Sequence, residues 1–172
     1  MRIISGKYKG KVIKGFDIDG TRPTMDRVKE SLFGIIQNNI KDSVCLDLFA
    51  GSGNLGIEAI SNGAKKCIFV DHNKKVINIL KENLKDISNN EIVYSDYDKY
   101  LNTTNNKFDI IFLDPPYKDN LINPSIELIL KNDLLNDNGL IICEYETEDI
   151  KCDLKLIKEK KYGSKYIKIY QK

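Results

Sequence analysis

The residues best suited to chemistry stand in the run Asp114-Pro115-Pro116-Tyr117, directly after an apolar segment at 110–113. Two successive prolines fix an extended turn and remove two N–H donors, which leaves the Asp114 carboxylate and nearby carbonyls as acceptors beside the Tyr117 ring. Such a site suits an exocyclic amine, which the acceptors would hold while the ring stacks on the base. Fixing that amine, and accepting its proton as it bonds to a methyl group, is the catalysis required. We predict that these four residues are catalytic; the alternative is a proline turn that only ends a strand.

A second motif, the glycine-rich run at 46–56, leads from an apolar strand into a helix. Gly51, Gly53 and Gly56 match the pattern G-x-G-x-x-G, and Asp71 follows the next apolar run about twenty residues later. Because glycine has no Cβ atom, a ligand can lie against this backbone at a helix N-terminus. Asp71 is placed to accept hydrogen bonds from a ribose diol. By itself the motif fits dinucleotide enzymes and S-adenosylmethionine enzymes equally.

Two further carboxylates favour S-adenosylmethionine as the ligand. Asp47 lies at the entry to the glycine loop, where a carboxylate would face a pyrophosphate badly but a sulfonium or amino group well. Asp96, just past the third predicted strand, could accept a hydrogen bond from an adenine amine or a backbone amide, with a helix N-cap as its alternative role. Three carboxylates around one pocket suit a cationic ligand better than a dinucleotide.

Alternating strands and helices must position these motifs. From residue 43 onward, short apolar runs alternate with amphipathic segments, which predicts a mostly parallel, doubly wound sheet with right-handed crossovers. The predicted strands are 44–49, 67–70, 92–94, 108–113 and 140–144, and the predicted helices between them are 54–62, 73–87, 96–101 and 121–131. Segments 154–159 and 162–170 are too close together for a crossover helix, so they are predicted to form an antiparallel hairpin on the sheet.

The N-terminal part is predicted to fold differently. Segments 2–5 and 11–16 are extended and flank a glycine-containing turn, which indicates a β-hairpin. The run Arg22-Pro23-Thr24 is predicted to be a loop, with Thr24 as the N-cap of a helix whose apolar spacing continues to about residue 39.

The 172 residues carry a formal net charge of only +2, but the charge is unevenly distributed. Residues 1–41 have a net charge of +5, residues 42–154 of −9 and residues 155–172 of +6. A polyanion would bind the basic ends and a cationic ligand the acidic centre. The only three arginines, Arg2, Arg22 and Arg27, lie within the first 27 residues, and a guanidinium can bind phosphate or carboxylate through two hydrogen bonds.

Composition limits the remaining possibilities. Length and an ordinary content of 41% hydrophobic and 30% charged residues fit one globular domain with at most a small appendage. No apolar run approaches the ~20 residues that span a bilayer, and the start is not that of a secretory signal, so we expect a cytoplasmic protein without membrane contact. The four cysteines form no CxxC pair, and we expect no metal site.

The motifs together resemble a known group of enzymes. The loop LDLFAGSGNLGIEAIS, the pair Val70-Asp71 and the DPPY run are similar to those of S-adenosylmethionine-dependent amino-methyltransferases. The flanks are more specific: MRIISGKYKGKVIKG at the start, TRPTMDRVKESLF at 21–33 and YGSKYIKIY at 162–170 resemble the RsmD family, the bacterial 16S ribosomal RNA guanine-N2 methyltransferases. The resemblance extends nearly from end to end.

This resemblance implies a Rossmann-like methyltransferase domain at 24–172 with an N-terminal β-hairpin extension at 1–23 that contacts RNA. It implies methyl transfer from S-adenosylmethionine to N2 of one guanine of the small ribosomal subunit, flipped into the pocket of Asp114 and Tyr117. The implied cofactor-binding residues are Arg22, Thr24, Asp47, Phe49, Ala50, Gly51, Ser52, Gly53, Asp71, His72, Asp96 and Tyr97. Among them, Arg22 and Thr24 would lie by the methionine end or the catalytic pocket, and His72 is more simply a surface residue beside Asp71. The implied RNA-binding residues are Arg2, Lys7, Lys9, Lys11, Arg22 and Arg27.

Three other functions are weighed against this one. The DPPY run also marks enzymes that methylate adenine N6 or cytosine N4 in DNA or RNA, but 172 residues leave no room for the recognition domain that the DNA enzymes usually carry. A nicotinamide-dependent oxidoreductase is disfavoured because the sequence shows no identifiable catalytic Lys, His or Tyr motif. The predicted C-terminal hairpin also counts against this class of enzyme. A non-catalytic RNA-binding module would not need Asp114 and Tyr117. Nothing demands more than a monomer.

Overall fold

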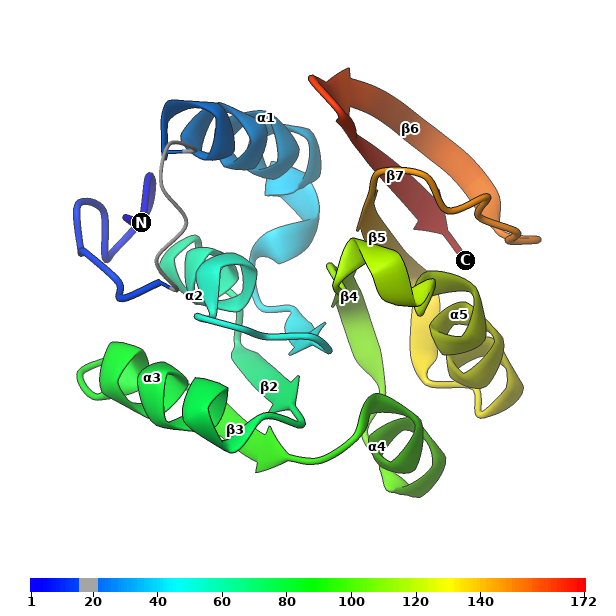
Figure 1. The fold of residues 1–172 in the computed structure, drawn as a ribbon, viewed down its shortest axis with the longest axis horizontal. Coiled ribbons are helices and arrows are strands. Elements are labelled where there is room, and N and C mark those ends of the chain that lie inside the picture. Colours follow the sequence, from blue (N-terminus) through cyan, green and yellow to red (C-terminus); the bar gives the residue numbers. More distant parts are fainter. Residues whose placement is uncertain (16–21) are drawn as a thin grey trace.

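A seven-stranded sheet forms the centre of the molecule in this computed structural model, which describes residues 1–15 and 22–172, with side chains given for 1–15 and 26–172. The strand order is β3-β2-β1-β4-β5-β7-β6 (Figure 1). Strands β1 to β5 are parallel, and β7 runs antiparallel to both β5 and β6. The strands are β1 (Val44–Asp47), β2 (Lys66–Asp71), β3 (Asn90–Tyr94), β4 (Phe108–Leu113), β5 (Leu135–Tyr145), β6 (Lys155–Tyr162) and β7 (Lys165–Gln171).

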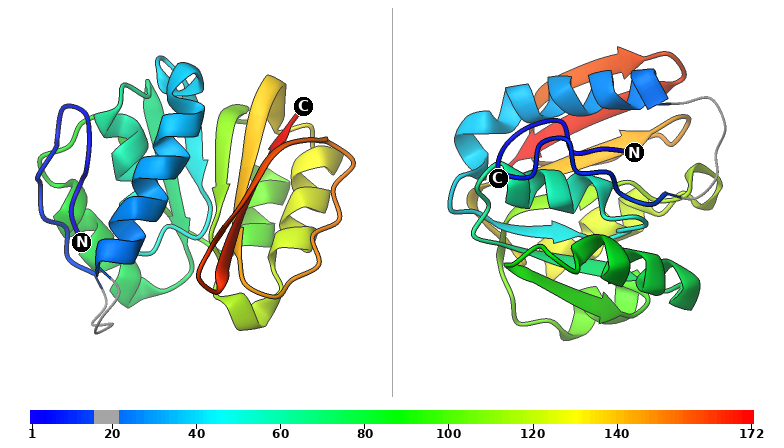
Figure 2. Two further views of the ribbon diagram at one scale, coloured as in Figure 1. Left: turned by 90° about the horizontal axis from the view of Figure 1, so that it is seen from above. Right: turned by 90° about the vertical axis from the view of Figure 1, so that its left-hand side faces the viewer.

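Helices cover both faces of this sheet (Figure 2). The helices are α1 (Arg22–Ile40), α2 (Asn54–Ser61), α3 (Lys74–Leu84), α4 (Tyr97–Thr103) and α5 (Ile122–Lys131), with a 3-10 turn η1 (Tyr117–Asp119). Apolar side chains of α1, α2 and α3 pack on one face, and those of α4 and α5 pack on the other. Neighbouring strand residues such as Ile110 and Ile111 are both fully buried but belong to opposite faces, which is typical of parallel strands covered on both sides.

The predicted fold class is confirmed: the sheet is mostly parallel, and the C-terminal strands form the expected antiparallel hairpin. The prediction of 108–113 matches β4 residue for residue. Strand β5 begins five residues earlier than predicted, because Leu135 pairs with Phe108 at the start of β4 even though the following residues are polar.

The start of α1 corrects the prediction of a loop at residues 22–24. The helix already includes Arg22, so Thr24 is not its N-cap. The first turn of a helix tolerates proline because its N–H groups have no partner within the helix, and Pro23 therefore does not stop it. The side chains of Arg22 and Thr24 lie outside the described residues.

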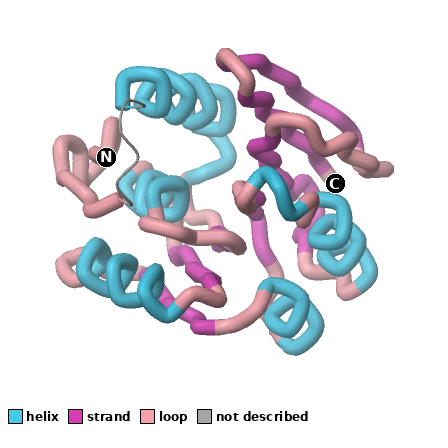
Figure 3. Tube along the Cα trace, viewed as in Figure 1, coloured by secondary structure: helices cyan, strands magenta, loops and turns pink. Residues whose placement is uncertain are grey.

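The N-terminal segment, defined here as residues 1–15, doubles back as predicted but does not form two regular strands (Figure 3). A single antiparallel bridge joins Arg2 and Val12. The N–H groups of Ile4 and Ser5 donate to the Glu58 carboxylate of α2, so they are not available to a partner strand. Phe16, the last residue of the predicted hairpin, lies outside the described residues. Within the described residues, no helix is long and apolar enough to cross a membrane.

Candidate active site

Four acidic residues line up along the carboxyl edge of the parallel strands. Asp47 ends β1, Asp71 ends β2, Asp96 lies two residues beyond β3, and Asp114 directly follows β4. Because these strands are adjacent in the order β3-β2-β1-β4, the fold brings together the carboxylates that the sequence distributes over 68 positions. Ligands of open α/β sheets bind at this edge.

The glycine loop joins β1 to α2 at the same edge. Gly51 and Gly53 have φ angles of 54° and 83°, in the left-handed region that favours glycine. A Cβ atom on Gly51 would meet only the Phe49 carbonyl oxygen, at 4.0 Å, so this stretch of backbone faces open space. On Gly56, a Cβ atom would lie 2.3 Å from the Phe69 ring. Gly51 therefore leaves the backbone accessible to a ligand, whereas Gly56 lets α2 pack closely on β2.

Two of the aspartates also hold the glycine loop in place. The buried Asp47 carboxylate accepts the Gly56 N–H at 2.9 Å, and Asp71 accepts the Gly51 N–H at 3.1 Å. Burial raises the pKa of Asp47 to about 7; the nearby Asp71 adds to the rise and the Gly56 hydrogen bond opposes it. Among the described residues, no lysine or arginine forms an ion pair with Asp47, Asp71 or Asp96.

The predicted adenine side of the pocket contains two aromatic rings. The Phe49 and Tyr97 rings lie 5.5 Å apart between centroids and are tilted by 40°. Asp96 occupies the N-cap position of α4, but its exposed carboxylate makes no capping hydrogen bond. It is therefore available to a ligand.

Three other predicted cofactor-binding residues differ in exposure at this edge. The side chains of Ala50 and Ser52 are buried, so a ligand would reach only their backbone. His72 is exposed beside Asp71, in agreement with the simpler interpretation as a surface residue.

The DPPY run turns away from β4 at the predicted place. Pro115 is buried and Pro116 exposed, and Tyr117 begins η1. The Tyr117 hydroxyl donates to Glu144 Oε1 at 2.8 Å, and Lys165 Nζ donates to the same oxygen at 2.6 Å. The Lys165 ammonium also lies 5.2 Å from the centre of the Tyr117 ring. Two partners thus fix the orientation of this ring.

Electrostatics around this turn favour the protonated form of the Asp114 carboxyl. Burial raises the pKa of the Asp114 carboxyl well above its usual range; Glu144 adds to the rise, and Lys165 partly opposes it. Burial and the Glu144 carboxylate also raise the pKa of Tyr117, so its hydroxyl stays protonated and serves as a donor. For Lys165, burial lowers the pKa, but the pairing with Glu144 outweighs it and the net pKa is raised.

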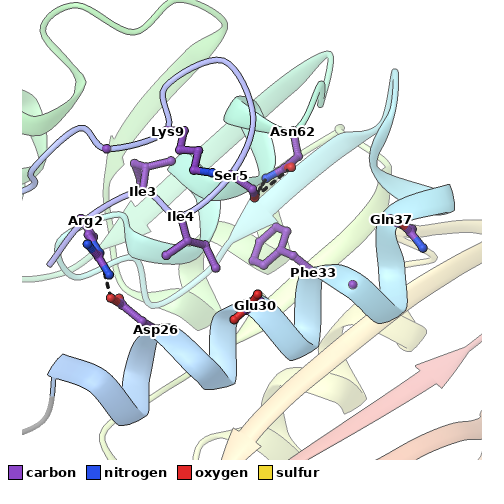
Figure 4. Close-up of a pocket in the computed structure, with 12 residues that line it drawn as sticks. Arg2, Ile3, Ile4, Ser5, Lys9, Asp26, Glu30, Phe33, Gln37 and Asn62 are labelled. Carbon is purple, nitrogen blue, oxygen red and sulfur yellow. Dashed lines mark hydrogen bonds and ion pairs between the residues drawn. The ribbon is translucent and has the colours of Figure 1, made fainter.

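The predicted RNA-binding residues lie on and beside the N-terminal segment. Lys7 and Lys9 are exposed, Arg2 pairs with Asp26 of α1 at 3.0 Å, and Lys11 lies 3.8 Å from Asp86. Arg27, on α1, is exposed. A cavity of about 580 Å³ lies between parts of this segment and α1, and Arg2, Lys9 and Phe33 are among the residues that line it (Figure 4). It is lined by the middle of α1 and not by the strand-end aspartates.

Comparison with known proteins assigns the chain to a family. The family described as Conserved hypothetical protein 95 matches residues 1–171. The ribosomal RNA small subunit methyltransferase D of Haemophilus influenzae is 39% identical over 180 residues, which cover 99% of this chain and 93% of the relative. The Escherichia coli protein of the same name is 35% identical over 178 residues, covering 100% of this chain and 90% of the relative. The chain belongs to the RsmD family.

Solved structures agree with membership of the RsmD family. An Escherichia coli structure described as a methyltransferase superimposes with a TM-score of 0.89 and 33% identity, covering 100% of this chain and 97% of that chain. The methyltransferase SMU.776, complexed with SAH, shares the fold with a TM-score of 0.71 at 18% identity over 87% of this chain and 49% of that chain. The fold of this RsmD-family chain is thus the Rossmann-like methyltransferase fold.

Glu144 and Lys165 contact Tyr117 of the candidate site in this RsmD-family chain, and the sequence alone did not indicate them. Glu144 lies at the carboxyl end of β5, and Lys165 begins the antiparallel β7. The end of one strand and the start of its antiparallel neighbour meet at the same edge, so a predicted register between these strands would have placed both residues beside Asp114. Among the described residues, no group of three His, Cys, Asp or Glu side chains is arranged to hold a metal.

Proposed function

We propose that this RsmD-family chain transfers a methyl group from S-adenosylmethionine to the exocyclic N2 amine of a guanine in 16S ribosomal RNA of the small subunit. The observation that carries the proposal is the position of Asp114 and Tyr117 at the same strand edge as the glycine loop, where Asp47 contributes to the raised pKa of Asp114. The relatives named ribosomal RNA small subunit methyltransferase D support ribosomal RNA as the substrate.

The donor set fits the cofactor. Asp47, Asp71 and Asp96 offer three carboxylates without a paired lysine or arginine among the described residues, which suits a cationic ligand. We propose that Asp71 holds the ribose hydroxyls, Asp96 the adenine, and the backbone at Gly51 the methionine part. When bound, S-adenosylmethionine supplies an electrophilic methyl group on its sulfonium. The solved relative of the same fold that is complexed with SAH supports this choice.

We assign the remaining chemistry to residues around the DPPY turn. The Tyr117 ring, fixed by Glu144 and Lys165, stacks on a guanine that has been flipped out of the RNA. Asp114 accepts hydrogen bonds from the N2 amine and takes its proton as the nitrogen bonds to the methyl group. Because its pKa is raised, the ionised Asp114 carboxylate binds a proton more tightly than an ordinary aspartate does. The extension at 1–23 and its basic residues contact RNA phosphates.

Mapping the product on small-subunit RNA by mass spectrometry tests this function. With labelled S-adenosylmethionine we expect one methyl group on guanine N2, and NAD should not bind in calorimetry. Asp114→Ala should lower the rate by about 10²–10⁴-fold, the range expected for loss of a general base, without loss of S-adenosylhomocysteine binding. Asp119→Ala, an exposed aspartate in the same turn, is the matched control and should keep full activity. A methyl group on adenine N6 or cytosine N4, or an active Asp114→Ala enzyme, would contradict the proposal.

The pH dependence of cofactor binding tests the role of Asp47. Its pKa of about 7 means that the carboxyl is largely protonated at pH 6, and a bound cation favours the ionised form. Affinity for S-adenosylmethionine should therefore rise by up to about tenfold per pH unit below pH 7 and level off above it, because binding releases a proton. Asp47→Asn keeps an acceptor for the Gly56 N–H and should lose this dependence in titration calorimetry. S-adenosylhomocysteine lacks the sulfonium charge but keeps the ammonium group, so an equal dependence for both ligands would place the ammonium group near Asp47, and a dependence for S-adenosylmethionine alone would place the sulfonium there. No dependence for either ligand would exclude this role.

A further inference from the structure

Asn83 of α3 connects the N-terminal segment with the glycine loop. Its Oδ1 accepts the Lys14 N–H at 2.8 Å, and its Nδ2 donates to two carbonyl oxygens, those of Lys14 and Ser52, both at 2.9 Å. Asn83 is buried. One amide side chain therefore holds the end of the described N-terminal segment and the middle of the glycine loop at the same time.

Lys29 of α1 makes the same kind of connection at the other end of the segment. Its Nζ donates to the Arg2 carbonyl oxygen at 2.6 Å and to Asn54 Oδ1 at 2.9 Å, and it forms an ion pair with Glu58 at 2.9 Å. Asn54 is the first residue of α2, directly after Gly53. The side chains of Lys29 and Glu58 are 3% and 0% exposed, so neither charge could lose its partner without a large penalty.

These contacts matter because the segment's own backbone hydrogen bonds, such as those from the Ile3 N–H to Lys11 and from the Gly10 N–H to Ile3, close its bend but do not reach the glycine loop. The segment is attached to the body by the buried Ile3 and Ile13, by a hydrogen bond from the Lys7 N–H to the Ser61 carbonyl oxygen, and by side chains of α1, α2 and α3. Of these side chains, Lys29 and Asn83 also reach residues 52–54 of the loop. If the segment leaves, Asn83 can still bond to the Ser52 carbonyl and Lys29 to Asn54, but neither side chain is then held in place by the segment. The docked segment and the ordered loop therefore stabilise each other.

We propose that Asn83 and Lys29 are positioning residues that couple docking of the N-terminal segment to ligand binding at the glycine loop. The inference rests on the proposed function, in which this loop binds the cofactor and the segment contacts RNA. A cofactor that orders residues 51–54 then favours the docked segment, and RNA held by the segment raises cofactor affinity by the same factor, because coupling between two binding sites is reciprocal. Couplings of this kind are typically about 5–150-fold.

Hydrogen exchange of the free enzyme, with and without saturating S-adenosylhomocysteine, tests the coupling without RNA or activity. In the wild-type chain, the ligand should slow exchange of the Ile4, Ser5 and Lys14 amides at least about fivefold, the lower end of typical couplings. Asn83→Asp keeps the acceptor for the Lys14 N–H but loses both donor bonds, and in this variant the slowing at Lys14 should disappear. Asn54→Ala removes only the loop contact of Lys29 and should reduce the slowing at Ile4 and Ser5.

Asn62→Ala is the matched control. Asn62 Nδ2 also holds the segment, by donating to Ser5 Oγ, but none of its hydrogen bonds reaches the glycine loop (Figure 4). In this variant the segment amides should exchange faster both with and without S-adenosylhomocysteine, and the ligand should still slow their exchange. If the wild-type enzyme binds the ligand but exchange of the segment amides does not slow, the coupling is overturned. If the ligand slows exchange fully in both Asn83→Asp and Asn54→Ala, the role of these contacts is overturned. Failure of the ligand to bind at all would instead contradict the proposed function.

Discussion

The two basic ends of the chain are attached to the sheet in opposite ways. The N-terminal segment has one isolated bridge and docks on the helices through the buried Ile3 and Ile13 and through hydrogen bonds. The C-terminal hairpin instead continues the sheet through a ladder from Tyr145–Tyr166 to Leu140–Gln171. Release of the first would expose the buried Ile3 and Ile13, whereas release of the second would break a ladder of the central sheet. Each end also reaches a different half of the site: the N-terminal segment touches the glycine loop, and β7 brings Lys165 to Tyr117.

A Lys–Glu ion pair stabilises each attachment, but the two pairs differ in burial. Lys29 and Glu58 are 3% and 0% exposed, and Glu58 additionally accepts hydrogen bonds from Ile4 and Ser5. Lys165 and Glu144 are 30% and 13% exposed, and their shared oxygen holds the Tyr117 hydroxyl. The buried pair fixes a segment of chain, and the partly exposed pair orients one ring.

The largest expected effect comes from breaking these pairs one at a time. Glu58→Ala leaves the Lys29 ammonium buried without its partner and should cost about 3–5 kcal/mol of unfolding free energy. Glu144→Ala should cost only about 1 kcal/mol, because water can reach Lys165, while methyl transfer falls as Tyr117 loses its acceptor. Urea unfolding and turnover measured on both variants check this; equal losses of stability would remove the distinction between the two ends.

A smaller effect is expected at the glycine turn of each end. Gly6 and Gly163 both have positive φ angles, of 76° and 62°. A Cβ atom on Gly6 would lie 1.9 Å from the Ser61 carbonyl oxygen, whereas nothing lies within 4 Å of one on Gly163. Gly163→Ala should therefore cost only the backbone strain of about 1–2 kcal/mol, and Gly6→Ala should in addition expel the segment from α2. Limited proteolysis should cut residues 1–15 faster only in Gly6→Ala, and cleavage at equal rates would count against docking of the segment on α2.

The smallest effect concerns the charges that both ends would offer to RNA. Lys7 and Lys9 at one end, and Lys155 and Lys158 at the other, are exposed. Replacing either pair with alanine should weaken RNA binding and lower the slope of log affinity against log salt by about one for each lost phosphate contact. Filter binding over a range of salt concentrations measures the slopes. An unchanged slope for the C-terminal pair would confine RNA contact to the N-terminal segment.

The sequence alone predicts those elements of the fold that are specified by residues close together in the chain, and fails for those that depend on a distant partner. The apolar run of β4 and the glycine loop specify their elements directly, and both were predicted. The start of β5 was not predicted, because Leu135 belongs to the strand only through its partner Phe108. The predicted N-terminal hairpin is too regular, because the N–H groups of Ile4 and Ser5 bond to Glu58, more than fifty residues away.

The candidate site shows the same limit. Aspartates that follow apolar strands could be recognised from position alone, since parallel strands end at one edge. Glu144 and Lys165 could not, because their meeting depends on the register of β5 and β7. Nor could Asn83, whose partner Lys14 lies 69 residues away in the chain.

The place of β6 at the edge of the sheet has one more consequence. Among the strands of the described residues, β6 pairs only with β7, so within this part of the chain no strand lies beside its outer backbone groups, and Leu156 and Ile157 are 44% and 38% exposed. Such an edge is a template for joining sheets of separate molecules, and lysines are a common protection against it. The four lysines of β6 (Lys155, Lys158, Lys160 and Lys161) repel the same strand of a second copy. A cluster of positive charge that serves a nucleic acid would thereby also protect the protein from aggregation while no RNA is bound.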